Sequence, residues 1–217
     1  ANGWVWFMAQ NFSFTLTIMA VYYADKGYAG LSLFFWACAV GCRPFQILYL
    51  PVLIVLMIST WKKEERDFNI VKKIKSDWYK GIPCFLVALS YCILNYARFG
   101  SIFEFGHNYL PEFTRTETGQ FNLAYLKGNL ANMFRLPKLI EDTGMMNFFT
   151  SDGIAFWLVN PIIILFVISI IYKLVKSRDK KLALGIMILA LLMVHIVILC
   201  LHRTLGGWHF GNRCTCD

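Results

Sequence analysis

The sequence predicts an all-α polytopic membrane protein. Of the 217 residues, 58% are hydrophobic and 16% are charged, a balance more apolar and less charged than that of soluble domains. Uncharged stretches recur at about the length of 20 residues with which a helix crosses the hydrocarbon core of a bilayer. These stretches are residues 1–24, 27–42, 44–61, 81–97, 153–172 and 182–202. We therefore expect about six transmembrane helices and one long loop.

The basic residues are concentrated in two short loops. The net charge is +8, and seven Lys or Arg lie in residues 62–80 and five in residues 173–181, whereas the longer stretch 98–152 holds only five. Such an excess in short loops marks the cytoplasmic side. Topology thus accounts for the positive charge, and nucleic acid is not an expected partner because no folded basic domain is present. Counting crossings back from these loops places Arg43, residues 98–152 and residues 203–217 on the outer side.

Residues 1–61 are expected to form three spans, of which the last two make a helical hairpin. The first span contains polar residues that are costly against lipid, so we expect them to face other helices or a polar cavity. They are Gln10, Asn11, Ser13, Thr15 and Thr17. Arg43-Pro44 predicts a break, because proline lacks an amide donor and biases the residue before it away from helix. At this apex Arg43 either snorkels to the interface or contacts a ligand; both readings stay open.

Residues 62–80 are predicted to be a cytoplasmic connector, and residues 81–97 a span that leads outward to Arg98. The outer loop 98–152 is too long for an idle connection, so we expect it to be functional. Within it apolar residues recur at roughly helical spacing, which predicts a helix in the membrane interface, with a plain packing helix as the alternative. These residues are Phe121, Tyr125, Leu130, Met133 and Phe134.

Residues 153–202 are expected to contain the last two spans. Asn160-Pro161 predicts a kink in the first of them. His195 and His202 are seven residues apart and lie near one helical face; we expect histidines satisfied by neighbouring helices more than a metal or proton site. Five cysteines lie in apolar stretches, where cysteine behaves as a small hydrophobe, so we assign no metal site and leave a divalent-metal requirement open. They are Cys38, Cys42, Cys84, Cys92 and Cys200.

The outer side gathers residues that suit a phosphate-bearing lipid. The arginines are Arg43, Arg98 and Arg213, and the guanidinium group suits bidentate recognition of phosphate. Tyr96 and Trp208 offer aromatic faces for a sugar ring or a prenyl chain. Carboxylates on the same side could accept a proton from an incoming hydroxyl. They are Glu104, Glu112, Glu117, Asp152 and Asp217.

Several motifs resemble those of the bacterial GT-C membrane glycosyltransferases, in the branch of the protein mannosyltransferases and aminoarabinose transferases. They are Cys42-Arg43-Pro44, Asn95-Tyr96, Arg98-Phe99-Gly100, Glu104-Phe105-Gly106 and residues 207–213 with Asp217. The similarity extends over nearly the whole chain in the same order. It implies a bacterial inner-membrane enzyme that moves a sugar from a polyprenyl-phosphate donor to a lipid, glycan or protein acceptor of the cell envelope at the outer face.

The resemblance also implies roles for individual residues. Arg98 and Arg213 would neutralise the donor phosphate, and Glu104, Trp208 and Asp217 would shape the pocket; Tyr96 and Arg43 complete the expected substrate-binding set. The catalytic carboxylate of the family lies in the first outer loop. By the count of crossings that loop would precede Ala1, so we assign no catalytic residue and expect residues 1–217 to be an internal piece of a single transmembrane glycosyltransferase domain, truncated at both ends. The chain has Arg213-Cys214 where the family tends to have Arg-Tyr.

Three other classes remain open. A polyprenyl-linked polysaccharide polymerase or ligase would use a large outer loop with paired arginines, for which Arg115 and Arg135 are available. A transporter would show repeated halves with matching breaks near mid-membrane, but the surroundings of Arg43-Pro44 and Asn160-Pro161 differ. The chain could also be an inactive structural remnant. The sequence identifies neither the sugar nor the acceptor.

Overall fold

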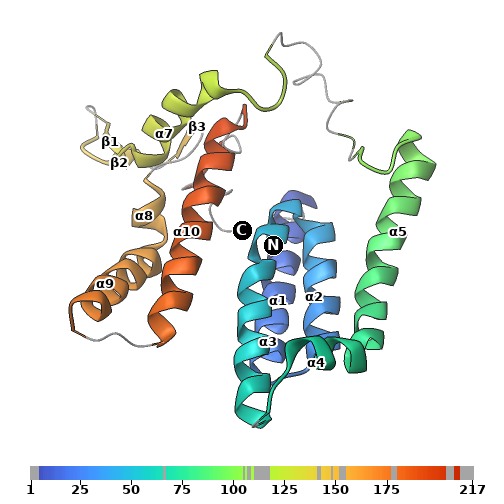
Figure 1. Ribbon diagram of the computed structural model, residues 1–217. Coiled ribbons are helices and arrows are strands. Elements are labelled where there is room, and N and C mark those ends of the chain that lie inside the picture. Colours follow the sequence, from blue (N-terminus) through green and yellow to red (C-terminus); the bar gives the residue numbers. More distant parts are fainter. Residues whose placement is uncertain are drawn as a thin grey trace. The chain divides into compact units, whose positions relative to one another are not determined.

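The chain is mostly helical, as predicted, and divides into two compact units, residues 1–110 and 111–216, which are described separately. Figure 1 shows the computed structural model of the chain. It describes residues 5–65, 67–104, 106, 109, 118–140, 143–147, 149–151, 155–176, 180–203 and 208–210.

The first unit is built from helices that follow one another with short connections. They are α1 (Val5–Asp25), α2 (Ala29–Cys42), η1 (Pro44–Tyr49), α3 (Leu50–Glu64), α4 (Ile70–Asp77), η2 (Trp78–Gly81) and α5 (Ile82–Phe99). Helices α1, α2 and α3 lie side by side, and the short helix α4 lies across their lower end in the view of Figure 1. This end carries the basic connector between α3 and α5.

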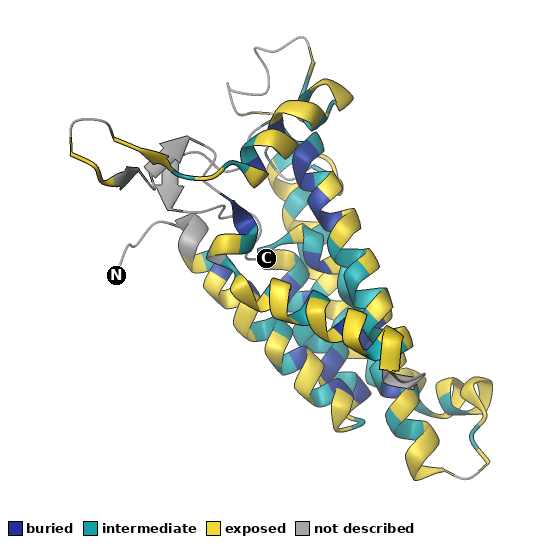
Figure 2. Cartoon of the chain, turned by 90° about the vertical axis from the view of Figure 1, so that its left-hand side faces the viewer, coloured by how far each residue is buried: buried dark blue, intermediate teal, exposed yellow. Residues whose placement is uncertain are grey.

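Within the described part of the chain, three helical runs are long and apolar enough to cross a membrane, which agrees with a membrane protein. They are Pro44–Glu64, Ile70–Phe99 and Leu182–Leu201. Helix α2 is apolar but has only 14 residues. Helices also cover most of the described residues of the predicted stretches 1–24 and 153–172, yet the count of six spans is not confirmed. Exposed side chains cover the outward sides of most long helices (Figure 2), and α5 buries none of its residues within the unit.

Helices α1 and α2 pack closely because small residues line their contact. Ala20 and Ala24 of α1 and Ser32 and Ala39 of α2 are almost fully buried. The Ser32 hydroxyl donates a hydrogen bond of 2.8 Å to the carbonyl oxygen of Ala20 on the other helix. Small residues let two backbones approach, and their packing is a main source of helix association in a bilayer.

The prediction for the polar residues of α1 is only partly confirmed. Gln10 and Ser13 are buried against other helices, whereas Asn11 and Thr15 are exposed. The Thr15 hydroxyl instead donates to the carbonyl oxygen of Asn11, 2.9 Å away in its own helix. Such a bond satisfies a hydroxyl without a second helix, which is why the sequence alone overestimated the polar contact surface of α1.

The break predicted at Arg43-Pro44 is present. Helix α2 ends at Cys42, Arg43 is extended with φ −143° and ψ 104°, and η1 begins at Pro44. Gln46 holds this apex against the bundle, since only 2% of it is exposed. Its carbonyl oxygen accepts from Trp36 Nε1 at 2.9 Å, and its side-chain oxygen accepts from the Thr17 hydroxyl at 3.2 Å.

Helices α2 and α5 run parallel, and two glycines fix their register. A Cβ atom on Gly30 would lie 3.0 Å from the carbonyl oxygen of Lys80, in η2 just before α5. Near the other end, a Cβ atom on Gly41 would fall on the ring of Tyr91. Both contacts pair a residue of α2 with one 50 positions later, so the two helices keep one register along their contact.

The second unit combines two long helices with a short helix and small strand pairs. Its elements are η4 (Leu123–Tyr125), α7 (Leu126–Phe134), β1 (Lys138–Leu139), β2 (Met146–Asn147), β3 (Phe149–Ser151), α8 (Phe156–Val159), α9 (Pro161–Lys176), α10 (Lys180–Leu201) and β4 (Trp208–Phe210). Strands β1 and β2 pair antiparallel, as do β3 and β4; the sequence did not predict these pairs. The helix predicted within residues 121–134 is present as α7. The predicted kink at Asn160-Pro161 separates α8 from α9.

Replacing Gly41 by alanine should lower the stability of the first unit. The added methyl group must displace the ring of Tyr91, and overpacking of this kind costs about 1–3 kcal/mol. Thermal unfolding in detergent, followed by the fluorescence of the tryptophans, measures the loss. Gly128 of α7 is the control, because in the described part of the chain nothing lies within 4 Å of a Cβ atom there. Gly128→Ala should leave stability unchanged or raise it, and an equal loss in both variants would show that the contact with Tyr91 is unimportant.

Candidate functional site

The predicted arginines of the first unit lie at one end of the parallel pair α2 and α5. A Cβ atom on Gly41 would meet the tip of the Tyr91 side chain, so Arg43, which follows the end of α2, and Arg98, in the last turn of α5, lie at the same end of this pair. Tyr91, Asn95 and Arg98 follow the spacing i, i+4, i+7 and share one helical face. Because Tyr91 faces α2, Arg98 lies on the side of α5 that is turned toward the end of α2. Arg98 is exposed and Arg43 is half-buried.

The turn that follows Arg98 is fixed by local contacts. Gly100 ends α5 in the left-handed region with φ +70°, and its N–H donates to the carbonyl oxygen of Tyr96 at 2.8 Å. The Asn95 side chain donates to the carbonyl oxygen of Ile102 at 3.2 Å. Gly106 also has a positive φ, and a Cβ atom there would lie 3.0 Å from Phe99 Cζ. The Arg-Phe-Gly and Glu-Phe-Gly motifs thus have a structural reason for both glycines.

Glu104 belongs to this turn. Its Oε1 accepts a hydrogen bond of 2.8 Å from the N–H of Gly106, two residues later. A carboxylate bonded in this way stiffens the loop and orients its negative charge toward backbone amides. The bond gives Glu104 a role in shaping the turn, beside the pocket role that the resemblance implies.

The structure does not bring Tyr96 together with Arg98. The Tyr96 side chain is 64% exposed, but two positions along a helix correspond to a rotation of about 200°. Tyr96 therefore lies on another face of α5 than Arg98. It can meet lipid or a lipid-linked chain beside α5, whereas Arg98 is turned toward the end of α2.

Five residues predicted on the outer side lie outside the described residues. They are Arg213 and Asp217 of the expected substrate-binding set and the carboxylates Glu112, Glu117 and Asp152. Trp208 lies in β4, opposite Ser151 of β3. The strand pair joins the end of the predicted outer loop to the motif at residues 207–213, two segments far apart in the sequence that were both expected on the outer side.

The most extensively hydrogen-bonded feature of the second unit is one that the sequence analysis missed: the end of α10. The Asn129 side chain, on α7, donates to the carbonyl oxygens of Cys200 at 3.0 Å and His202 at 2.6 Å. The N–H of Asn122 donates to the carbonyl oxygen of Leu201, and the N–H of Arg203 donates to that of Gln120. The last carbonyl groups of a helix have no partner within it, so these bonds attach the loop to α10.

Packing accompanies these bonds. Met133 of α7 and Cys200 of α10 are fully buried, and Asn129 is 9% exposed. The ring of Phe121 meets the His202 ring edge-on at 5.1 Å between centroids, and the Gln120 amide nitrogen lies 3.1 Å from His202 Nε2. Helix α7 is therefore a packing helix on its buried side, while Leu130 and Phe134 remain exposed. Asn122 contacts α10 only through its backbone N–H, so Asn129, a polar residue among the apolar residues of α7, was the one sequence signal of this contact.

The basic connector of the first unit carries its own ion pairs. Lys73 Nζ lies 2.6 Å from Glu65 and 3.8 Å from Asp77, and Lys80 Nζ lies 2.8 Å from Asp77. Pairs of this exposed kind each contribute about 0–1 kcal/mol. They hold α4 in place and offer no arrangement for catalysis. No group of three metal-ligating side chains occurs within the described residues.

Comparisons with known proteins give no family. No protein-family model, no curated protein and no solved structure matches the chain. The function is therefore argued from the residues, their geometry and the motif resemblance.

Replacing Asn129 by aspartate should loosen α7 from α10. The variant keeps the shape but puts a carboxylate oxygen where the amide donated to two carbonyl oxygens, so two hydrogen bonds are lost and repulsion is added, at a cost of about 2 kcal/mol or more. Hydrogen exchange of the α7 amides should become faster. Asn132→Asp is the matched control, because Asn132 lies in the same helix, is half-buried and forms no side-chain hydrogen bond within the described residues. Equal exchange in both variants would contradict the capping role.

Proposed function

We propose that the chain is part of a membrane glycosyltransferase that takes a sugar from a polyprenyl-phosphate donor and passes it to a cell-envelope acceptor at the outer face of a bacterial inner membrane. The observation that carries the proposal is the placement of Arg43 and Arg98 at the same end of the parallel helices α2 and α5. Two guanidinium groups at one helix end suit the phosphate of a lipid-linked sugar.

The surroundings of the arginines support a lipid-linked donor over a soluble one. Helix α5 exposes a series of large apolar side chains below Arg98, where a prenyl chain embedded in the bilayer could lie against it. They are Phe85, Leu86, Leu89, Ile93 and Leu94. The phosphate of such a lipid would remain at the membrane boundary, at the level of Arg98. The charged head and the apolar chain of the donor then have separate surfaces on one helix.

The roles proposed for the individual residues are supported by helix geometry and by the resemblance. Arg98 binds the donor phosphate, and Arg43 adds a second positive charge at the apex of the hairpin. Glu104 stiffens the turn after Arg98, and Tyr96 contacts the lipid side of α5. Trp208, Arg213 and Asp217 are proposed, on the resemblance alone, as further substrate-binding residues. No residue is assigned as the catalytic base.

Arg98→Ala should weaken the binding of polyprenyl phosphate about tenfold or more, because a charge-assisted hydrogen bond contributes about 1.5–3 kcal/mol. The affinity of Arg98→Lys for polyprenyl phosphate should lie between that of the wild type and that of Arg98→Ala, since lysine keeps the charge but cannot bind bidentately. Binding to the purified protein in detergent is measured by the displacement of a labelled polyprenyl phosphate. Lys63→Ala, at the other end of the unit, serves as the control and should bind normally. Loss of binding in Lys63→Ala equal to that in Arg98→Ala, or no binding by the wild type, would refute the donor site.

The reaction products of the full-length protein distinguish a glycosyltransferase from a polymerase or ligase and from a transporter. Incubation with a polyprenyl-phosphate monosaccharide and membrane acceptors should yield acceptors that carry one added sugar. Transfer of a preassembled glycan would identify a polymerase or ligase. Movement of the lipid-linked sugar across the membrane without any new covalent product would identify a transporter.

A further inference from the structure

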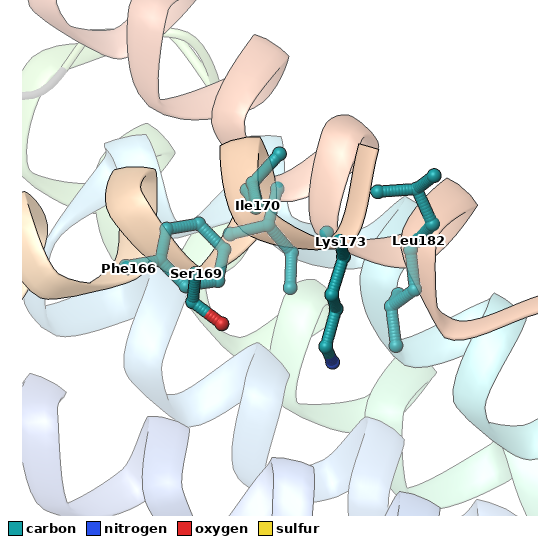
Figure 3. Close-up of a pocket in the computed structure, with 8 residues that line it drawn as sticks. Phe166, Ser169, Ile170, Lys173 and Leu182 are labelled. Atoms are coloured by element: carbon teal, nitrogen blue, oxygen red, sulfur yellow. The ribbon is translucent and has the colours of Figure 1, made fainter. Parts of the chain in front are cut away.

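An apolar groove lies between α9 and α10 at the basic end of the second unit. It has a volume of about 160 Å³. Phe166, Ser169 and Ile170 of α9 form one wall, and Gly185 and Ile188 of α10 form the other (Figure 3). Gly185 has no side chain to fill the space, and a Cβ atom there would already touch Ile170 at 3.4 Å. Gly185 therefore lets α10 pack closely against Ile170 at one side of the groove.

Lys173 stands at the mouth of the groove. It follows Phe166, Ser169 and Ile170 on the same face of α9, one turn closer to the helix end, and its amino group and the Ser169 hydroxyl point to the same side (Figure 3). Among the described residues no carboxylate pairs with Lys173, whereas Lys176 donates to the hydroxyl of Tyr172 at 2.8 Å. The groove thus combines an apolar floor with one half-buried cation at its edge.

The chain around the mouth is strongly basic. Residues 173–181 contain five Lys or Arg and a single acidic residue, Asp179. This excess of basic residues predicts that residues 173–181 lie on the cytoplasmic side, where the membrane surface is negatively charged. A ligand at this place must bring negative charge to the lysine and an apolar segment to the groove. Basic pockets between transmembrane helices on this side are typical sites for anionic lipid head groups.

We propose that the groove between α9 and α10 binds an anionic phospholipid of the cytoplasmic leaflet. Its phosphate pairs with Lys173 Nζ at the membrane surface, and the upper part of one acyl chain lies in the groove against Phe166, Ile170 and Ile188. A cavity of about 150 Å³ with apolar walls holds a guest the size of benzene. The groove therefore takes only a short part of the chain, and the rest stays in the bilayer against the exposed sides of α9 and α10.

The proposal is independent of the transferase function and uses different residues. The charge of the head group makes the site selective for anionic lipids, because the choline cation of phosphatidylcholine is repelled by the basic surface. A lysine near the membrane surface favours an anionic lipid by about fivefold in affinity. That preference, and not binding as such, is the property to be measured.

The test uses the purified chain in dodecyl maltoside micelles with either dioleoyl phosphatidylglycerol or dioleoyl phosphatidylcholine added. Bound lipid is counted by native mass spectrometry, and protection is measured by thermal unfolding. The wild type should prefer phosphatidylglycerol about fivefold. Lys173→Gln should remove the preference and Lys173→Glu should reverse it, while Lys176→Gln, one turn away on the same helix, should keep it.

Two further measurements distinguish the contribution of the groove to lipid binding from that of the lysine charge. Gly185→Leu fills the groove and should weaken the binding of both lipids equally. Glycerol phosphate, which has the anion but no acyl chain, should give no protection. Equal binding of both lipids by the wild type, an equal loss in Lys176→Gln and Lys173→Gln, or full protection by glycerol phosphate would each overturn the proposal.

Discussion

The carbonyl groups at the end of a helix must find hydrogen-bond donors, and this requirement organises both units. At the end of α10 the donors are the Asn129 side chain and the backbone N–H of Asn122. At the end of α2 the extended residue Arg43 returns its N–H to Ala39 at 2.8 Å, and at the end of α5 Gly100 does the same to Tyr96. In lipid an unsatisfied backbone group costs several kcal/mol. The segments that leave these helices are therefore held against them, and the candidate site residues of the first unit lie on such segments.

What could be predicted from the sequence was local. A proline after Arg43 is enough to end a helix there, and a second one at residue 161 separates α8 from α9, because the lost amide and the steric clash act within a few residues. The helix α7 followed from the spacing of its apolar residues. The number of spans did not follow. The polar side chains of α1 and the short lengths of α2 and α9 leave three runs among the described residues that meet the requirements of a span.

The features that position the candidate site were not predictable, because they depend on residues far apart in the chain. Nothing near Gly41 in the sequence indicates that the ring of Tyr91 will cover it, yet this contact sets the register of α2 and α5 and brings Arg43 and Arg98 to one end. The same holds for Asn129, whose partners are more than 70 residues away. A resemblance of motifs lists Tyr96 and Arg98 together, whereas helix geometry places them on different faces.

The two ends of the first unit differ in the kind of cation that they present, and the difference bears on what each end can bind. The end with the connector carries lysines, and Lys73 and Lys80 are already paired with Glu65 and Asp77. Lysine is a compact, strongly hydrated charge on a flexible stem, suited to a diffuse anionic surface. The other end carries Arg43 and Arg98, and the carboxylate of Glu104 there accepts from the N–H of Gly106. A planar guanidinium binds phosphate through two parallel hydrogen bonds and holds it in one orientation. In the proposed function, the end with Arg43 and Arg98 holds one phosphate while its substituent reacts, and that task requires a fixed orientation, which lysines on a flexible stem do not supply.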